Sequence, residues 1–179
     1  MLQTPPAPPA LTVHVNPAKA GTADAPAPAT VRIDLAGDLS GSALTIFFPQ
    51  GLRISNTGLA ACDATDAQIL KGKCRAAKAG SGLLTTKDGE RLPIKPLVSN
   101  AGLTLRVGDD VLRGAFSGAS GKYSAKLTVK LPKPLRKLSA LSLTLNAEKG
   151  DATLFGLRGC PLSFKTVLGK TLTADADCV

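Results

Sequence analysis

The chain has 179 residues and a formal net charge of +9 at pH 7. Apolar residues make up 44% and aromatic residues only 3%, without tryptophan, which argues against a disordered chain and predicts a core of Leu, Val, Ile and Ala. The 18 glycines and 13 prolines favour short elements joined by turns, and no apolar run approaches the ~20 residues that a membrane-spanning helix needs.

Residues 1–28 are predicted to form a Pro/Ala-rich N-terminal segment with one strand. The tract MLQTPPAPPA is typical of extended, polyproline-like chain, and LTVHV (11–15) alternates as a strand does. Met1 leads into this tract without the apolar region of a secretory signal. The chain is therefore either cytosolic or a mature chain whose signal peptide has been removed.

Residues 29–179 show strand after strand. The clearest alternation is in KYSAKLTVKL, where Tyr123, Ala125, Leu127, Val129 and Leu131 share one face. LTLRV and VLRGAF flank the turn 108–110 and indicate a hairpin. We therefore expect an all-β fold of the immunoglobulin-like β-sandwich type.

One short helix is expected in the loop between Cys62 and Cys74. In DATDAQIL (63–70), Asp63 would cap the helix, with Asp66 three residues further on. A weak repeat relates TIFFPQGLR (45–53) to TVKLPKPLR (128–136), which indicates two halves, 29–100 and 101–179.

Four cysteines allow three pairings, and structural disulfides Cys62–Cys74 and Cys160–Cys178 are the favoured interpretation. The first would close a local loop. CPLSFKTVLGKTLTADADC is typical of a hairpin turning at Gly169, whose register sets Cys160 opposite Cys178 on the inward face. The alternatives are reduced core thiols and a metal site, although metal ligands usually stand at closer CxxC-type spacings. Disulfides favour an oxidising compartment, and therefore the secreted alternative for Met1.

The sequence shows no convincing catalytic pattern. His14 is the only histidine, so no histidine pair is available for a metal, and a Ser-His-Asp triad would depend on a residue near the N-terminus. Three carboxylate pairs are interpreted as a helix cap, a turn and an outward strand face, respectively: Asp63 with Asp66, Asp109 with Asp110, and Asp175 with Asp177. We predict no enzyme, no cofactor and no metal.

The positive charge gathers in two places. A strand face and the segment after it supply five candidate contacts to a polyanion: Lys126, Lys130, Lys133, Arg136 and Lys137. A second cluster surrounds Cys74: Lys71, Lys73, Arg75 and Lys78. Because aromatic residues do not interleave with these lysines, no specific nucleic-acid site is expected. The favoured interpretation is a solvated strand whose lysines resist edge pairing, with polyanion binding as the alternative.

Three segments carry a resemblance to a known group of proteins: FPQGLRISN, GLAACDATDAQI and CRAAKAGSG. Together with GKYSAKLTVKLPKPLRKLSALSLTLNAEKGDATLFGLRGC, they resemble poorly characterised secreted, Cys-containing repeat-type proteins of high-GC actinobacteria, over about 45–179. The group usually has Cys-Pro at Cys74-Arg75 and Cys-Gly at Cys160-Pro161. The resemblance implies secretion, a β-sandwich and no assigned catalytic residues.

From these observations we expect a secreted or cell-surface module that is structural or mediates interactions with itself or another envelope protein. The alternative is a binding domain for an anionic polymer (a wall polymer, a polysaccharide or a nucleic acid) that uses the basic strand face.

Overall fold

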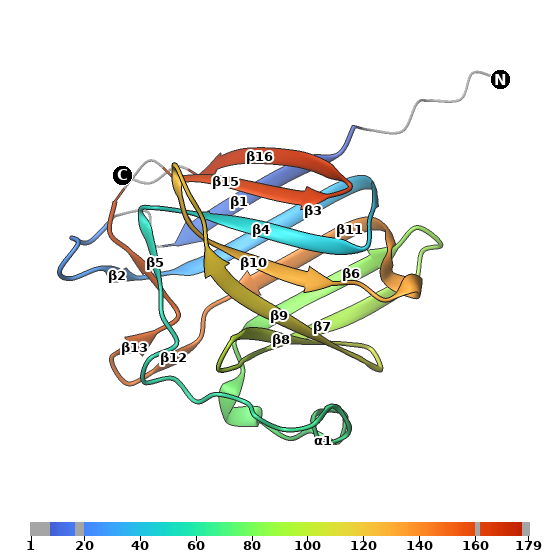
Figure 1. The fold of residues 1–179 in the computed structure, drawn as a ribbon, viewed down its shortest axis with the longest axis horizontal. Coiled ribbons are helices and arrows are strands. Elements are labelled where there is room, and N and C mark those ends of the chain that lie inside the picture. The colour runs from blue at the N-terminus through green and yellow to red at the C-terminus, as the bar shows by residue number, and fades with distance from the viewer. Residues whose placement is uncertain (1–7, 17–19, 160–161, 177–179) are drawn as a thin grey trace.

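The computed structural model describes residues 8–16, 20–159 and 162–176 and consists almost wholly of strands (Figure 1). The predicted Cys160–Cys178 disulfide and Asp177 lie outside the described residues. The strands are β1 (Ala10–Asn16), β2 (Ala27–Pro28), β3 (Thr30–Ser40), β4 (Ala43–Pro49), β5 (Leu52–Ile54), β6 (Gly80–Thr86), β7 (Arg91–Val98), β8 (Gly102–Val107), β9 (Asp110–Gly118), β10 (Tyr123–Lys130), β11 (Lys137–Leu145), β12 (Glu148–Lys149), β13 (Ala152–Thr153), β14 (Phe155–Leu157), β15 (Leu162–Leu168) and β16 (Lys170–Ala176). The helical elements are α1 (Asp66–Leu70), η1 (Arg75–Ala77) and η2 (Lys133–Leu135).

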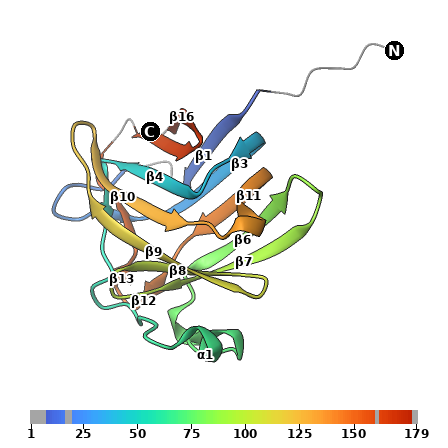
Figure 2. The same ribbon diagram turned by 45° about the vertical axis from the view of Figure 1, so that its right-hand side comes forward.

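Eleven strands form one antiparallel ladder that is nearly closed as a barrel. Their order is β1-β3-β11-β6-β7-β8-β9-β10-β4-β15-β16, and the two outermost strands, β1 and β16, lie next to each other (Figures 1 and 2). The predicted all-β class is confirmed, with 59% strand and 7% helix. The immunoglobulin-like sandwich is not confirmed, because these strands join one continuous ladder.

The core fills the interior of this ladder with alternate side chains of each strand. Val31, Ile33 and Leu35 of β3 are at most 2% exposed, as their alternation predicts. Phe48 of β4 is fully buried, with its ring centroid 5.5 Å from that of Phe155. The small sheet β2-β14-β5 supplies Phe155 and further buried residues to the same core, so a few large rings and many aliphatic side chains complete it.

Two predicted hairpins are confirmed. β8 and β9 pair with Val107 opposite Asp110 across a two-residue turn. β15 and β16 pair from Leu162 opposite Ala176 to Leu168 opposite Lys170, which is the register expected for a turn at Gly169. Gly169 has φ +70°, and a Cβ there would collide with the carbonyl oxygen of Ser40, so both backbone and space require glycine.

Two sequence interpretations need correction. The helix begins two residues later than predicted, because its cap is Thr65 rather than Asp63: the Thr65 hydroxyl accepts from the Gln68 backbone amide, and the Gln68 side-chain oxygen accepts from the Thr65 backbone amide. Asp66 lies in the first turn instead of closing the capping box. Tyr123 does not face the core with Leu127, because the register of β10 shifts between Tyr123 and Ala125.

The N-terminal strand predicted within 1–28 is present as β1, which pairs with β3. Strands from the ranges 29–100 and 101–179 alternate in the ladder: β11 lies between β3 and β6, and β4 lies between β10 and β15. Within the described residues, no helix is long and apolar enough to cross a membrane.

Candidate anion-binding groove

The Cys62–Cys74 segment is a loop folded against the outside of the barrel. A disulfide joins the two cysteines, whose Cα atoms lie 5.4 Å apart, as predicted for this pair. Between them, the Thr65 capping box starts α1, and Cys74 adopts the left-handed conformation with φ 71° before η1. The disulfide therefore joins the two ends of the loop, and the cap fixes the start of the helix within it.

A small second hydrophobic cluster attaches this loop to the barrel. Ile69 of α1 is 1% exposed and packs with Cys62 and Ala77. Leu97 of β7 completes the cluster, and Val111 of β9 packs against it. Since the core residues Ile94 and Val98 alternate with Leu97 along β7, Leu97 points outward, and the loop covers an apolar spot on the barrel surface.

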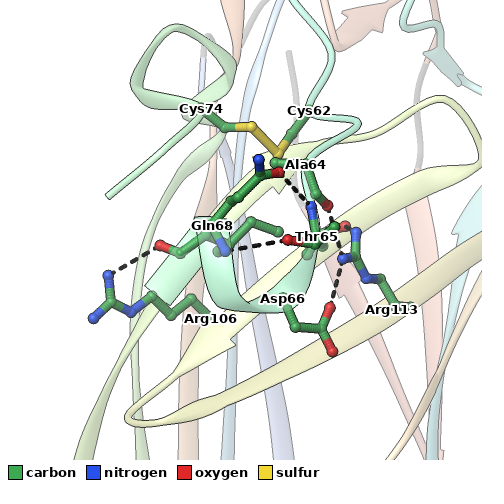
Figure 3. Close-up of a disulfide and its surroundings, with 10 residues drawn as sticks. Cys62, Ala64, Thr65, Asp66, Gln68, Cys74, Arg106 and Arg113 are labelled. Carbon is green, nitrogen blue, oxygen red and sulfur yellow. Dashed lines mark hydrogen bonds and ion pairs between the residues drawn. A yellow bond between two sulfur atoms is a disulfide. The ribbon is translucent and has the colours of Figure 1, made fainter. Parts of the chain in front are cut away.

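Two arginines on neighbouring strands tie the loop further (Figure 3). Arg113 of β9 donates to the carbonyl oxygen of Ala64 at 3.1 Å and forms an ion pair with the Asp66 carboxylate. Arg106 of β8 donates to the carbonyl oxygen of Ile69 at 3.4 Å. These contacts hold α1 over β8 and β9 and leave the other side of the loop open towards β6 and β7.

On that open side lies a groove of about 770 Å³ between the loop and the outer surface of the barrel. Residues 69–75 and Lys78 form one wall, residues 80–82 of β6 and 93–97 of β7 form the floor and the other wall, and Arg106 closes one part. Much of this lining has no side chain or a rigid one, because it includes Gly80, Gly82, Pro93 and Pro96. This volume is within the range of ligand-binding clefts in proteins.

All charged residues that line the groove are positively charged. Six of its residues are basic and none is acidic: Lys71, Lys73, Arg75, Lys78, Lys95 and Arg106. None of the six forms an ion pair within the described residues. A concave surface lined by charges of one sign focuses the electrostatic field and raises the local concentration of counter-ions. The electrostatic field in the groove therefore favours the binding of an anion.

The sequence indicated only part of this groove. The cluster around Cys74 supplies four of its basic residues, but Lys95 and Arg106 come from separate strands and were not associated with it. The alternation in RLPIKPLV could have indicated Lys95. It places Lys95 on the same outward face of the strand as Leu97, against which the loop packs. However, alternation alone does not show that the loop packs on this face, so it could not place Lys95 beside the lysines of the loop.

The predicted strand-face contacts lie elsewhere. Lys126 and Lys130 are on β10, Lys133 begins η2, Arg136 follows it, and Lys137 begins β11. Arg136 donates to the carbonyl oxygen of Leu131 at 2.9 Å, so its guanidinium partly braces the turn. None of the five lines the groove.

The other sequence candidates are not brought together. Asp109 lies in the β8–β9 turn, Asp175 accepts a hydrogen bond from Ser163 at 2.8 Å, and His14 is exposed on β1 opposite Arg32. In the part of the chain that the structure describes, no three His, Cys, Asp or Glu side chains gather as metal ligands. A second cavity of about 470 Å³, between residues 54–56 and the ends of β8, β9 and β10, is lined without any charged residue.

The fold and the groove define an all-β, barrel-like protein with a disulfide-clamped cationic groove. Comparisons of the chain with protein-family models, with curated proteins and with solved structures gave no match.

Proposed function

We propose that this protein is a non-catalytic, extracellular binding module that holds an anionic polymer in the groove beside the Cys62–Cys74 loop. The observation that carries the proposal is the lining of six basic residues without a carboxylate. A groove with six cations along its lining suits a chain with repeated negative charges better than a single small anion, because each repeat can meet another cation.

The disulfide supports the extracellular part of the proposal. A bond between Cys62 and Cys74 persists in oxidising compartments, which agrees with the secretion that the resemblance to actinobacterial proteins implies. The disulfide also favours binding at the groove, because it orders the loop that forms one wall. A loop that is already ordered loses less conformational entropy when a ligand arrives.

Charge reversal at two positions tests the proposal. Lys73 lies on the loop wall and Lys95 on β7, both are exposed, and neither side chain makes a hydrogen bond or ion pair within the described residues. We expect K73E/K95E to lower the affinity of the groove for a heparin fragment at least about tenfold at low salt, since two attractive contacts become repulsive.

The matched control is K130E/K137E, which changes the net charge equally on the predicted strand face. The proposal requires that this control bind much more tightly than K73E/K95E, and that binding weaken with salt. Equal losses in both variants would mean that only the overall charge matters. A selective loss in K130E/K137E would instead place the polymer on the strand face.

A further inference from the structure

Phe47 is an aromatic side chain on the outer surface of the barrel. Its neighbours on β4, Ile46 and Phe48, are at most 1% exposed and belong to the core, so Phe47 points outward. The strand register places it between Lys126 of β10 and Lys165 of β15. In space, therefore, an aromatic ring does interleave with lysines, although the sequence separates them.

Tyr123 joins Phe47 on this outer surface. Its ring centroid lies 5.4 Å from that of Phe47, with the ring planes inclined at 56°. Tyr123 is 7% exposed, yet it is not part of the main core. The shifted register of β10 thus turns the only tyrosine against the outside of the sheet, where it braces Phe47.

Three ammonium groups surround the two rings. The Lys165 Nζ lies 4.1 Å from the Phe47 centroid and 5.1 Å from the Tyr123 centroid. Lys126 Nζ lies 6.0 Å from Phe47, and Lys122 Nζ lies 5.7 Å from Tyr123. None of these lysines forms an ion pair within the described residues. Cation–π contacts worth about 0.5–1 kcal/mol each at exposed sites hold the ammonium groups near one another.

We propose that this aromatic–lysine platform (Phe47, Tyr123, Lys122, Lys126 and Lys165) is a second binding site, and that it takes an acidic polysaccharide. The apolar C–H face of a pyranose ring can lie on Phe47 when the Lys165 ammonium leaves the ring face and, with its neighbours, donates hydrogen bonds to a uronate carboxylate. Outward threonines on the same strands, Thr45 and Thr128, pair with each other across β4 and β10 and offer hydroxyls to the sugar.

The platform and the groove lie far apart around the barrel. The groove is on β6 and β7, whereas the platform is on β10, β4 and β15, with β8 and β9 between them in the ladder. In Figure 1, β15 lies at the top and the loop with α1 at the bottom. One molecule can therefore hold two polysaccharide chains and bridge them. This bridging rests on the proposed function of the groove, while binding at the platform does not.

The test measures how many fluorescent galacturonate oligosaccharides bind per protein molecule. We expect two for the wild type and one for K126E/K165E, with K133E/K149E as a control of equal charge change outside both sites. F47S should weaken galacturonate binding at the platform about tenfold or more while leaving the binding of polyphosphate, which has no sugar ring, unchanged. Circular dichroism verifies that each variant is folded.

The outcomes separate the two proposals. If K126E/K165E still binds as many oligosaccharides as the wild type, the platform is not a site. If F47S weakens polyphosphate and galacturonate equally, or if the platform binds oligothymidylate in preference to galacturonate, the saccharide assignment is wrong. If instead K73E/K95E retains full binding and K126E/K165E abolishes it, the groove proposal fails and the platform stands alone. Bridging is read directly when protein captured on immobilised galacturonate takes up a second, fluorescent chain.

Discussion

Replacement of Ile69 by alanine tests whether the disulfide loop is an integral part of the fold. Ile69 is 1% exposed and lies at the centre of the second hydrophobic cluster. Ile→Ala removes about three carbon groups, worth about 2.4 kcal/mol at roughly 0.8 kcal/mol each. A partly unfilled cavity raises the cost, and the better helix propensity of alanine offsets a few tenths, so we expect a loss of about 3 kcal/mol.

The assay is urea unfolding followed by far-ultraviolet circular dichroism, since the chain has no tryptophan and its one tyrosine packs outside the main core. The matched control is Leu70→Ala, one residue further on, where the side chain is only half-buried and borders the groove. This variant should lose less than about 1 kcal/mol. If both variants lose the same small amount, the loop is not packed on the barrel as described.

Three further predictions concern the loop, the ladder and the second disulfide. Thr65→Ala removes the capping box and should cost about 1 kcal/mol in urea unfolding, whereas Thr65→Ser should be nearly neutral; equal effects would argue against the cap. Gly80→Ala places a Cβ against a carbonyl oxygen of β11 and should destabilise the fold far more than Gly89→Ala, because both glycines have positive φ (+146° and +92°) but nothing lies within 4 Å of the new Cβ at 89; similar costs would contradict the β6–β11 register. Thiol labelling followed by mass measurement should find no free cysteine before reduction and four after it, and two labelled thiols in the native protein would refute the Cys160–Cys178 bond.

Local patterns in the sequence predicted much of the fold. Alternation of period two identifies which side chains of a strand share a face, and it correctly predicted the buried side of β3 and the shared buried face of Leu127, Val129 and Leu131. The position of Gly169 in the hairpin pattern predicted the turn and with it the register of β15 and β16. Cysteine spacing predicted the Cys62–Cys74 bond. Each of these predictions depends only on residues that are close together in the sequence.

Non-local pairing could not be read in the same way. Alternation does not say which strand lies beside which, so the insertion of β11 between β3 and β6 and the near-closure of the ladder were not predicted. One extra residue in β10 reversed the face of Tyr123, because a bulge leaves the hydrophobic pattern almost unchanged. The groove could not be predicted without the order of the strands, since Lys95 and Arg106 lie beside the loop lysines only after the strands pair.

The most direct test of the central claim is an amide hydrogen-exchange footprint of the protein with and without a heparin fragment. If the polymer lies in the groove, protection should increase in 70–82 and in 93–97, the segments that line it. Segment 130–137 on the predicted strand face should exchange as in the free protein. Protection confined to 130–137, with the groove segments unchanged, would contradict the account.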